Sequence, residues 1–245
     1  MIWLLAAFFL TAVLYASVGF GGGSTYNALL ALSGTDYRIL PLIALSCNIV
    51  VVAGSSIRFA RARVTPWRGA LFLTAIAAPA ALLGGLTPIG DGAFLTVLGA
   101  SLVLTALTML LPVAAADDKP RKAAHLIPLA AAPLGYLAGL VGIGGGIFLA
   151  PLLHLARWNN ARAIAATASF FILVNSLFGV VGQLLKGGEG LFVAAIDLGL
   201  PLIVAVAVGG QIGSLLAVKF LPQRWIRWGT ALLTAVVGAR LLLAV

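Results

Sequence analysis

Charged residues are scarce in this chain of 245 residues, because only 9% of them are Asp, Glu, Lys or Arg. Soluble domains usually carry about 25%. Hydrophobic residues make up 62% of the chain, and the mean hydropathy is +1.15. Apolar stretches near the ~20 residues needed to cross a bilayer recur from end to end. The composition excludes a soluble globular protein and predicts an all-α polytopic membrane protein.

The sequence also lacks the residue sets that enzymes and metal sites require. It has two histidines and one cysteine, Cys47, which cannot form an intrachain disulfide. It contains no HExxH or CxxC motif and no Ser/His/Asp set in a credible context. The glycine-rich segment GFGGGST, starting at Gly19, lacks the P-loop lysine. We therefore expect no enzyme activity, no cofactor and no metal site.

Glycine is plentiful, and its pattern is duplicated. GFGGGSTYNALLAL starts at Gly19 and GIGGGIFLAPLLHL starts at Gly142, and the two windows share four glycines and three leucines at an offset of 123 residues. Each cluster is followed by an apolar segment of about ten residues, 24–33 or 147–156, which as a helix covers ~15 Å, half a bilayer. Eight longer apolar runs are each able to span the membrane: 2–19, 39–57, 69–87, 92–112, 125–142, 163–185, 198–221 and 225–245. Asp197, just before the seventh run, predicts the N-cap of that helix.

The distribution of Lys and Arg shows how the short segments run. If the short segments do not reverse the chain, the loops on the two sides hold eight and six positive residues, which favours neither orientation. If each short segment returns as a hairpin with the span before it, one side holds twelve positive residues and the other keeps only Arg38, Lys186 and Arg240. The twelve are Arg58, Arg61, Arg63, Arg68, Lys119, Arg121, Lys122, Arg157, Arg162, Lys219, Arg224 and Arg227. The hairpin arrangement satisfies the positive-inside rule and accounts for the net charge of +9 without a nucleic-acid partner.

The hairpin topology gives each half one glycine-broken hairpin and three crossings. Since three is odd, the second half enters the membrane from the opposite face, and the two halves are inverted repeats. We expect repeat 1 at 1–113, a cytoplasmic linker at 114–124 and repeat 2 at 125–245, with both termini outside the cytoplasm. Inverted repeats with broken helices are a recurring plan of secondary transporters, whose substrates bind near the midplane.

The glycine clusters predict an anion site. Glycine permits the positive φ of a sharp turn, and the following helix begins with N–H groups that have no intrahelical acceptor. Those groups and the positive end of the helix dipole bind anions. The candidate residues are Gly21, Gly22, Gly23, Ser24, Gly144, Gly145 and Gly146. The alternative is that these glycines only allow close helix packing.

Polar residues near the middle of the spans are the remaining site candidates: Ser46, Asn48, Thr167, Ser169, Asn175 and Gln211. Polar groups are costly in a bilayer and are often functional there. Amides and hydroxyls donate to an anion without adding a fixed charge that would trap it. The alternative is that they join helices by interhelical hydrogen bonds of ~0.6 kcal/mol each.

Three features carry a family resemblance: the glycine clusters, ARAIAATASFFILVNSLFGVVG from Ala161 and GGQIGSLLAVKFLPQRWIRWGTALLTAVVGARLLL from Gly209. They resemble the corresponding features of the sulfite exporter TauE/SafE family of membrane permeases, and the resemblance covers nearly the whole chain. The first half departs from the family at ALSCNIVVV, where a TS pair is more usual. The resemblance implies transport of sulfite, sulfoacetate or other organosulfonates across a bacterial inner membrane.

Together these observations predict an alternating-access carrier of a small sulfur-containing oxyanion. Its expected partners are the anionic substrate and the lipid bilayer, and a homo-oligomer is left open. The rival interpretations are a passive channel for the same anions and a membrane scaffold that transports nothing.

Overall fold

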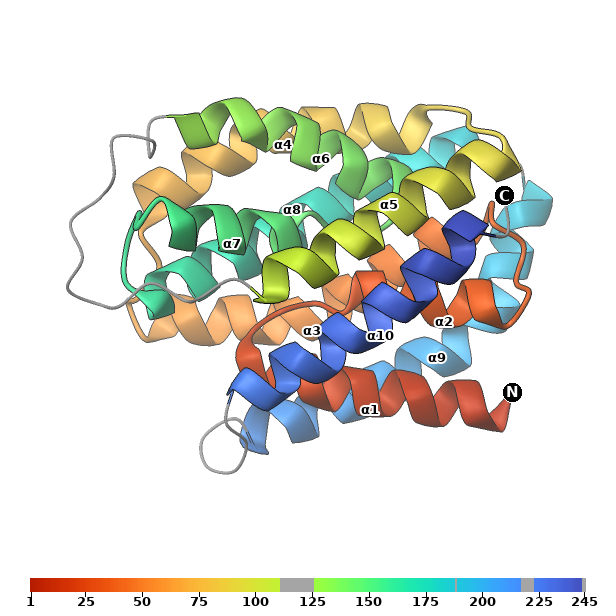
Figure 1. The fold of residues 1–245 in the computed structure, drawn as a ribbon, viewed down its shortest axis with the longest axis horizontal. Coiled ribbons are helices and arrows are strands. Elements are labelled where there is room, and N and C mark those ends of the chain that lie inside the picture. Colours follow the sequence, from red (N-terminus) through yellow and green to blue (C-terminus); the bar gives the residue numbers. More distant parts are fainter. Residues whose placement is uncertain (111–125, 188, 217–222, 244–245) are drawn as a thin grey trace.

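The computed structural model describes residues 1–110, 126–187, 189–216 and 223–243, and within these ranges it is all-helical (Figure 1). The helices of the first half are α1 (Ile2–Val18), α2 (Gly23–Leu32), α3 (Leu40–Arg61), α4 (Trp67–Leu86) and α5 (Asp91–Leu110). Those of the second half are α6 (Ile127–Val141), α7 (Gly146–Leu155), α8 (Ala161–Lys186), α9 (Glu189–Leu216) and α10 (Gln223–Leu243). The prediction of an all-α membrane protein is confirmed.

The same order of helices occurs twice. In each half a helix of 17 or 15 residues is followed by one of 10 residues and then by three longer helices. Within the described residues, five helices are long and apolar enough to cross a membrane: α3, α4, α5, α8 and α9. α1 and α6, the helices before the glycine turns, are shorter than the ~20 residues of a full crossing.

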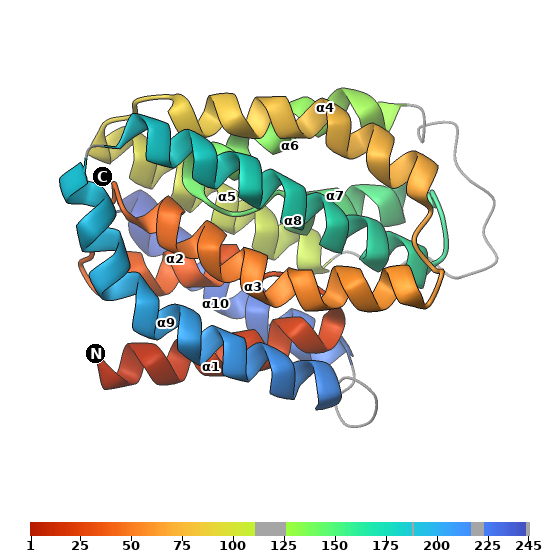
Figure 2. The same ribbon diagram turned by 180° about the vertical axis from the view of Figure 1, so that it is seen from behind.

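Positive-φ glycines end α1 and α6 and let the chain turn back. α1 ends at Gly19 with φ of 81°, and α6 ends at Gly142 with φ of 76°, both in the left-handed region. α2 then runs back beside α1, where the Thr25 and Tyr15 hydroxyls lie 2.9 Å apart. α7 likewise returns along α6 (Figure 2). Each short helix therefore forms a returning hairpin with the helix before it.

The contacts between the halves come in matched sets. α1 packs on α9, and the counterpart of α1 in the second half, α6, packs on α4, the counterpart of α9. α3 packs on its own counterpart, α8, and α5 packs on its counterpart, α10. The first turn of α3 and the last turn of α8 line one cavity, so these two helices are antiparallel. α5 and α10 are antiparallel as well, because Gly99 packs on Leu242 and Gly238 packs on Val103. Corresponding helices thus cross in opposite directions.

The loops divide between two ends of the molecule. At one end, the Trp158 ring packs over Gly69, which brings the loops 62–66 and 156–160 together. The opposite end carries the loops 33–39 and 87–90, the end of α8 and both termini (Figure 1). The expected linker 114–124 lies outside the described residues, and so does Lys219.

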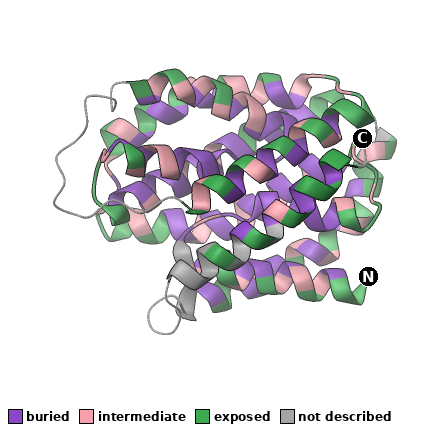
Figure 3. Cartoon of the chain, in the orientation of Figure 1, coloured by how far each residue is buried: buried purple, intermediate pink, exposed green. Residues whose placement is uncertain are grey.

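Buried residues lie along the centre of the bundle and exposed residues on its outside (Figure 3). Many of the exposed residues are large and apolar. Leu71, Phe72, Leu83 and Leu129, for example, are all more than half exposed, as suits a surface covered by lipid tails. At the helix contacts, a Cβ on Gly139 of α6 would overlap the Ala81 carbonyl oxygen of α4. Small residues therefore bring the helix backbones close together, as is usual in membranes.

The expectation that Asp197 caps a helix is wrong. α9 begins at Glu189, before the apolar run, and Asp197 lies within it. The helix begins earlier because Gly190 to Ile196 continue an apolar helical stretch, so one acidic residue does not end it.

Candidate functional site

The two glycine turns meet at the centre of the structure. A Cβ placed on Gly23 would lie 2.9 Å from the Gly142 carbonyl oxygen and 2.8 Å from that of Ile143. Only a residue without a side chain allows this approach of two backbones. The N-terminus of α2 and the turn before α7 therefore form one continuous polar region.

Asn48 of α3 lies between the turns. Its Nδ2 donates to the Ile143 carbonyl oxygen at 3.3 Å, and a Cβ on Gly21 or Gly23 would overlap its amide. A Cβ on Gly144 would come within 2.8 Å of the same Nδ2. Asn48 is fully buried, and its Oδ1 has no hydrogen-bond partner among the described residues. A single amide of the first half therefore contacts the turns of both halves.

α8 supplies the opposite wall. Ile172 packs against Gly21 and Gly144, and the Ser176 hydroxyl lies 3.3 Å from the position of a Cβ on Gly144. Asn175 precedes Ser176 and is fully buried. Within the described part of the chain, the Asn175 amide and the Ser176 hydroxyl have no hydrogen-bond partner. Buried polar groups normally have partners, so these atoms are candidates for contact with a ligand.

Two further candidates of α8 have backbone partners. Ser169 donates its hydroxyl to the Gly19 carbonyl oxygen, so it holds the end of α1. Thr167 donates to the Ala163 carbonyl oxygen of its own helix at 2.9 Å. Both side chains are buried. Ser169 therefore belongs to the turn region, whereas the Thr167 hydroxyl is bonded within α8.

The helices that follow the turns begin without side-chain caps. The N-cap of α2 is Gly22 with φ of 133°, and that of α7 is Gly145 with φ of 75°, and neither can supply a capping oxygen. By contrast, the Asn160 side chain caps α8 by accepting from the Ala163 amide. The Ser24 hydroxyl is buried at the start of α2, and no residue that the structure describes bonds to it. The N-terminal turn of α2 thus presents polar hydrogens to the region around Asn48.

Sequence reasoning missed three polar residues of α2. The Asn27 Nδ2 donates to the Val141 carbonyl oxygen at 2.7 Å and so joins the two halves. Tyr26 is fully buried, stacks on Phe8, and its hydroxyl lies 3.2 Å from the position of a Cβ on Gly22. Thr25 bonds to α1, as described above. The sequence feature that could have identified these residues is STYN, four consecutive polar residues at the start of an otherwise apolar segment.

Two sequence candidates lie away from the turns. Ser46 donates to the Leu42 carbonyl oxygen of its own helix at 2.8 Å and lines a separate apolar cavity between α3, α8 and α9. Gln211 is exposed on α9. The structure therefore brings together the glycine turns, Ser24, Asn48, Ser169 and Ser176. Asn175 is the buried neighbour of Ser176 in α8, whereas Ser46 and Gln211 lie away from the turns.

The turn region is polar but uncharged, since amides, hydroxyls and backbone groups form the contacts described above. No group of three or more His, Cys, Asp or Glu side chains that could hold a metal ion occurs in the described residues. Backbone N–H groups at a helix start, with neutral donors around them, suit an anion.

The chain matches one family model and several known proteins. Residues 4–241 match the sequence model of the family described as sulfite exporter TauE/SafE. A "probable membrane transporter protein" of Sinorhizobium fredii is 32% identical over 96% of both chains. Another, of Methanocaldococcus jannaschii, is 27% identical over 82% of this chain and 79% of its own. "Sulfite exporter TauE/SafE family protein 1" of Arabidopsis thaliana is 41% identical over 71 residues, 29% of this chain and 16% of its own. No solved structure matches the chain.

Proposed function

The chain belongs to the sulfite exporter TauE/SafE family of membrane transporters, and we propose that it carries a small sulfur-containing oxyanion or organosulfonate by alternating access. One observation carries the proposal: two glycine turns meet around buried amides and hydroxyls whose polar atoms have no partner in the described residues. The oxygens of sulfite, sulfoacetate or a related sulfonate would accept from the donors among these atoms, the Asn175 Nδ2 and the Ser24 and Ser176 hydroxyls. The name of the Arabidopsis relative supports the same class of substrate.

In this proposal the anion binds where α2 and α7 begin. The backbone N–H groups of Gly23 and Ser24 and the positive ends of the two helix dipoles favour negative charge. The Gly146 N–H, in contrast, donates to the Gly144 carbonyl oxygen at 3.0 Å. Asn175 donates to the anion's oxygens through its Nδ2 atom, and Asn48 donates through the second hydrogen of its Nδ2, since the first is donated to the Ile143 carbonyl oxygen. A neutral donor set binds the anion without an opposing charge, so the anion can leave again. Ser46 and Gln211 stay predictions that this conformation does not bring to the site.

The proposed alternation of access comes from the relation between the halves. The repeated order of helices and the antiparallel crossing of α3 with α8 and of α5 with α10 support two inverted repeats. Rocking of one half against the other would open the turn region to each side in sequence. The backbone breaks at Gly19–Gly22 and Gly142–Gly145, whose φ values are positive at both ends, provide the flexing points.

The positive-inside rule supports a location in a bacterial inner membrane with both termini periplasmic. Arg63 and Arg157 lie in loops at the end of the molecule opposite the termini, which matches the expected cytoplasmic face. Single cysteines at Thr35 and Ala62 test this topology. We expect an impermeant thiol reagent to reach Thr35→Cys from the outside of intact cells and not Ala62→Cys.

The test of transport is counterflow in proteoliposomes preloaded with unlabelled sulfite. A carrier accumulates labelled sulfite transiently against its gradient and saturates, and sulfoacetate, thiosulfate, sulfate and chloride are compared as competitors. Asn175→Ala should reduce counterflow at least tenfold, because a charge-assisted hydrogen bond contributes about 1.5–3 kcal/mol. The matched control is Asn159→Ala, the same substitution at an exposed loop residue.

The result also separates the rival functions. A passive anion channel gives flux without counterflow. A scaffold gives no flux with any anion, and Gly22→Ala or Gly145→Ala then lowers abundance without changing any substrate response. Either pattern would refute the proposed carrier.

A further inference from the structure

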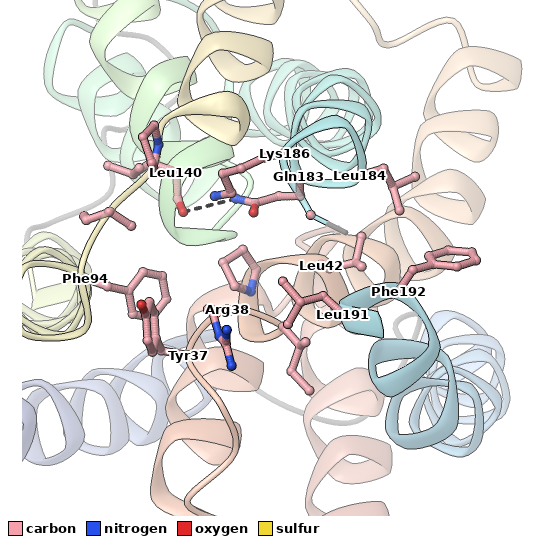
Figure 4. Close-up of a pocket in the computed structure, with 15 residues that line it drawn as sticks. Tyr37, Arg38, Leu42, Phe94, Leu140, Gln183, Leu184, Lys186, Leu191 and Phe192 are labelled. Atoms are coloured by element: carbon pink, nitrogen blue, oxygen red, sulfur yellow. Dashed lines mark hydrogen bonds between the residues drawn. The ribbon is translucent and has the colours of Figure 1, made fainter. Parts of the chain in front are cut away.

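A cavity of about 210 Å³ opens at the end of the molecule that carries the chain termini (Figure 4). It lies between the start of α3, the loop 87–90, and the junction of α8 with α9. Its walls are mostly apolar, and they include Leu42, Phe94, Leu191 and Phe192. At ~30 Å³ for each water-sized group, it has room for about seven non-hydrogen atoms.

Two cations lie at this apolar cavity, Arg38 and Lys186 (Figure 4). They belong to different halves and reach the cavity from the α2–α3 loop and the end of α8. The Lys186 Nζ donates to the Thr87 carbonyl oxygen at 3.3 Å, and the Arg38 Nη2 lies 2.6 Å from the Asp36 Oδ2. Both head groups are therefore held near the cavity by partners of their own.

Topology does not explain the position of these cations. The positive-inside rule predicts few Lys and Arg at this end, and by that rule only Arg38, Lys186 and Arg240 belong to it. Two of the three line the same small cavity. A cation at a partly apolar site is favoured where an anion shares the site. Asp36 already provides that anion for Arg38, whereas the only hydrogen-bond partner of Lys186 among the described residues is the neutral Thr87 carbonyl oxygen, so it is mainly Lys186 that calls for an anion in the cavity.

The inner end of the cavity lies against the second glycine turn. Pro41 lines the cavity, and its Cα is 2.5 Å from the position of a Cβ on Gly142. Leu140 also lines it, and the Leu140 carbonyl oxygen accepts from the Gln183 Nε2 at 3.3 Å. One residue, Pro41, therefore separates the cavity from the turn region. An anion in the cavity would be next to the route into the proposed site.

We propose that this cavity is a second, outer binding site for a small organic anion, an alkanesulfonate with a chain of two or three carbons. The sulfonate oxygens accept from Lys186 and Arg38, and the chain lies on Leu42, Phe94 and Leu191. An inorganic anion such as sulfite would leave the apolar wall without contact, so the cavity favours the organosulfonate over the inorganic ion. The choice of a sulfonate rests on the proposed function.

The test measures binding of propane-1-sulfonate by isothermal titration calorimetry to the full chain in phosphatidylcholine nanodiscs. Lys186→Gln should weaken binding about tenfold, because it removes one charge-assisted contact. Ile89→Trp should weaken it at least as much, since Ile89 lines the cavity and a larger ring would fill it. The matched control is Arg61→Gln, which removes an exposed cation at the opposite end of α3. It should bind like the unaltered protein.

Equal binding in Lys186→Gln, Ile89→Trp and the unaltered protein would overturn the proposal, and so would an absence of binding. An anionic lipid offers the same chemistry, so the titration is repeated with phosphatidylglycerol in the nanodiscs. Unchanged affinity supports a soluble anion as the occupant. Loss of sulfonate binding would identify a lipid site and refute the proposal.

Failure of the outer site is distinguishable from failure of transport. If only the outer site is wrong, Lys186→Gln leaves counterflow unchanged at every substrate concentration. If it is right, Lys186→Gln raises the KM for organosulfonate without lowering the maximal rate. If the carrier function is wrong, counterflow is absent in the unaltered protein, while propane-1-sulfonate binding still reports on the cavity.

Discussion

Replacement of Asn175 by leucine should stabilise the protein while it stops transport. Asn175 is fully buried, and neither atom of its amide has a partner in the described structure. An unsatisfied buried polar group costs about 1–3 kcal/mol in soluble proteins. Interhelical hydrogen bonds in membranes average ~0.6 kcal/mol, which lowers the estimate. For two atoms, we expect Asn175→Leu to raise the free energy of unfolding by about 1–3 kcal/mol.

The assay pairs thermal unfolding in detergent with sulfite counterflow in proteoliposomes. Asn175→Leu should unfold at a higher temperature than the unaltered protein and show at least a tenfold loss of counterflow. The control is Thr105→Val on α5, which also replaces a fully buried polar side chain by an apolar one of similar shape. The Thr105 hydroxyl has no partner among the residues described, so this change should stabilise by about half as much and leave transport intact.

Two results would refute this reasoning. A lower unfolding temperature for Asn175→Leu would mean that the amide supports the fold, as an interhelical staple does. Full transport by Asn175→Leu would mean that the amide does not contact the anion. Stabilisation with loss of transport is expected only if the amide is kept for a ligand at the expense of stability.

Three further predictions use the same two assays. Gly34→Ala, with φ of 74° and open space around it, should cost about 1–2 kcal/mol for its φ alone and transport normally. Gly144→Ala, with φ of 84°, should cost more than Gly34→Ala, because its Cβ also overlaps Ile172 and the Asn48 amide, and it should lower transport by pushing on that amide. Gly139→Ala should lower stability by about 1–3 kcal/mol through its contact with α4, with an unchanged KM in the protein that folds. A hydrogen bond from the Arg38 guanidinium holds the pKa of the Asp36 carboxyl below its usual range. This exposed pair therefore stabilises the folded protein slightly at a pH above the ordinary carboxyl pKa. The stabilisation is lost as the pH falls through the lowered pKa. The unfolding temperatures of the unaltered protein and Asp36→Asn should therefore converge in acid, and a gap that widens in acid would contradict the sign.

The fold was largely predictable because the hydropathy of a segment and the charge of a loop depend only on consecutive residues of the sequence. The glycine clusters indicated turns at Gly19 and Gly142, and these glycines have positive φ and follow α1 and α6 in the structure. Loop charge predicted that the short segments return beside the helices before them, and α2 and α7 contact α1 and α6. The start of α9 was not predictable in the same way. Asp197 has the chemistry of a cap, but the apolar stretch before it already forms helix, and packing decides where the helix begins.

The candidate site was only partly predictable, because a midpoint in sequence does not give the direction of a side chain. Ser46 and Asn48 are two residues apart on α3, so they point to different sides of the helix. Asn48 faces both turns, whereas Ser46 faces the cavity near α9. Ser46 and Ser169 lie 123 residues apart, the same offset as the glycine clusters, but Ser169 bonds to Gly19 while Ser46 bonds within its own helix. The two halves therefore share a backbone plan and differ in the side chains that contact the turns.

The hydrogen bonds at the turns run from each half to the other. Ser169 of the second half holds the carbonyl of Gly19, and Asn48 and Asn27 of the first half hold the carbonyls of Ile143 and Val141. Neither half alone can satisfy the backbone of its own broken helix. We therefore expect that, during synthesis, the polar break of the first half has no partner for the Gly19 carbonyl oxygen until the chain has been made past Ser169. The turn region is thus complete only when both halves are present.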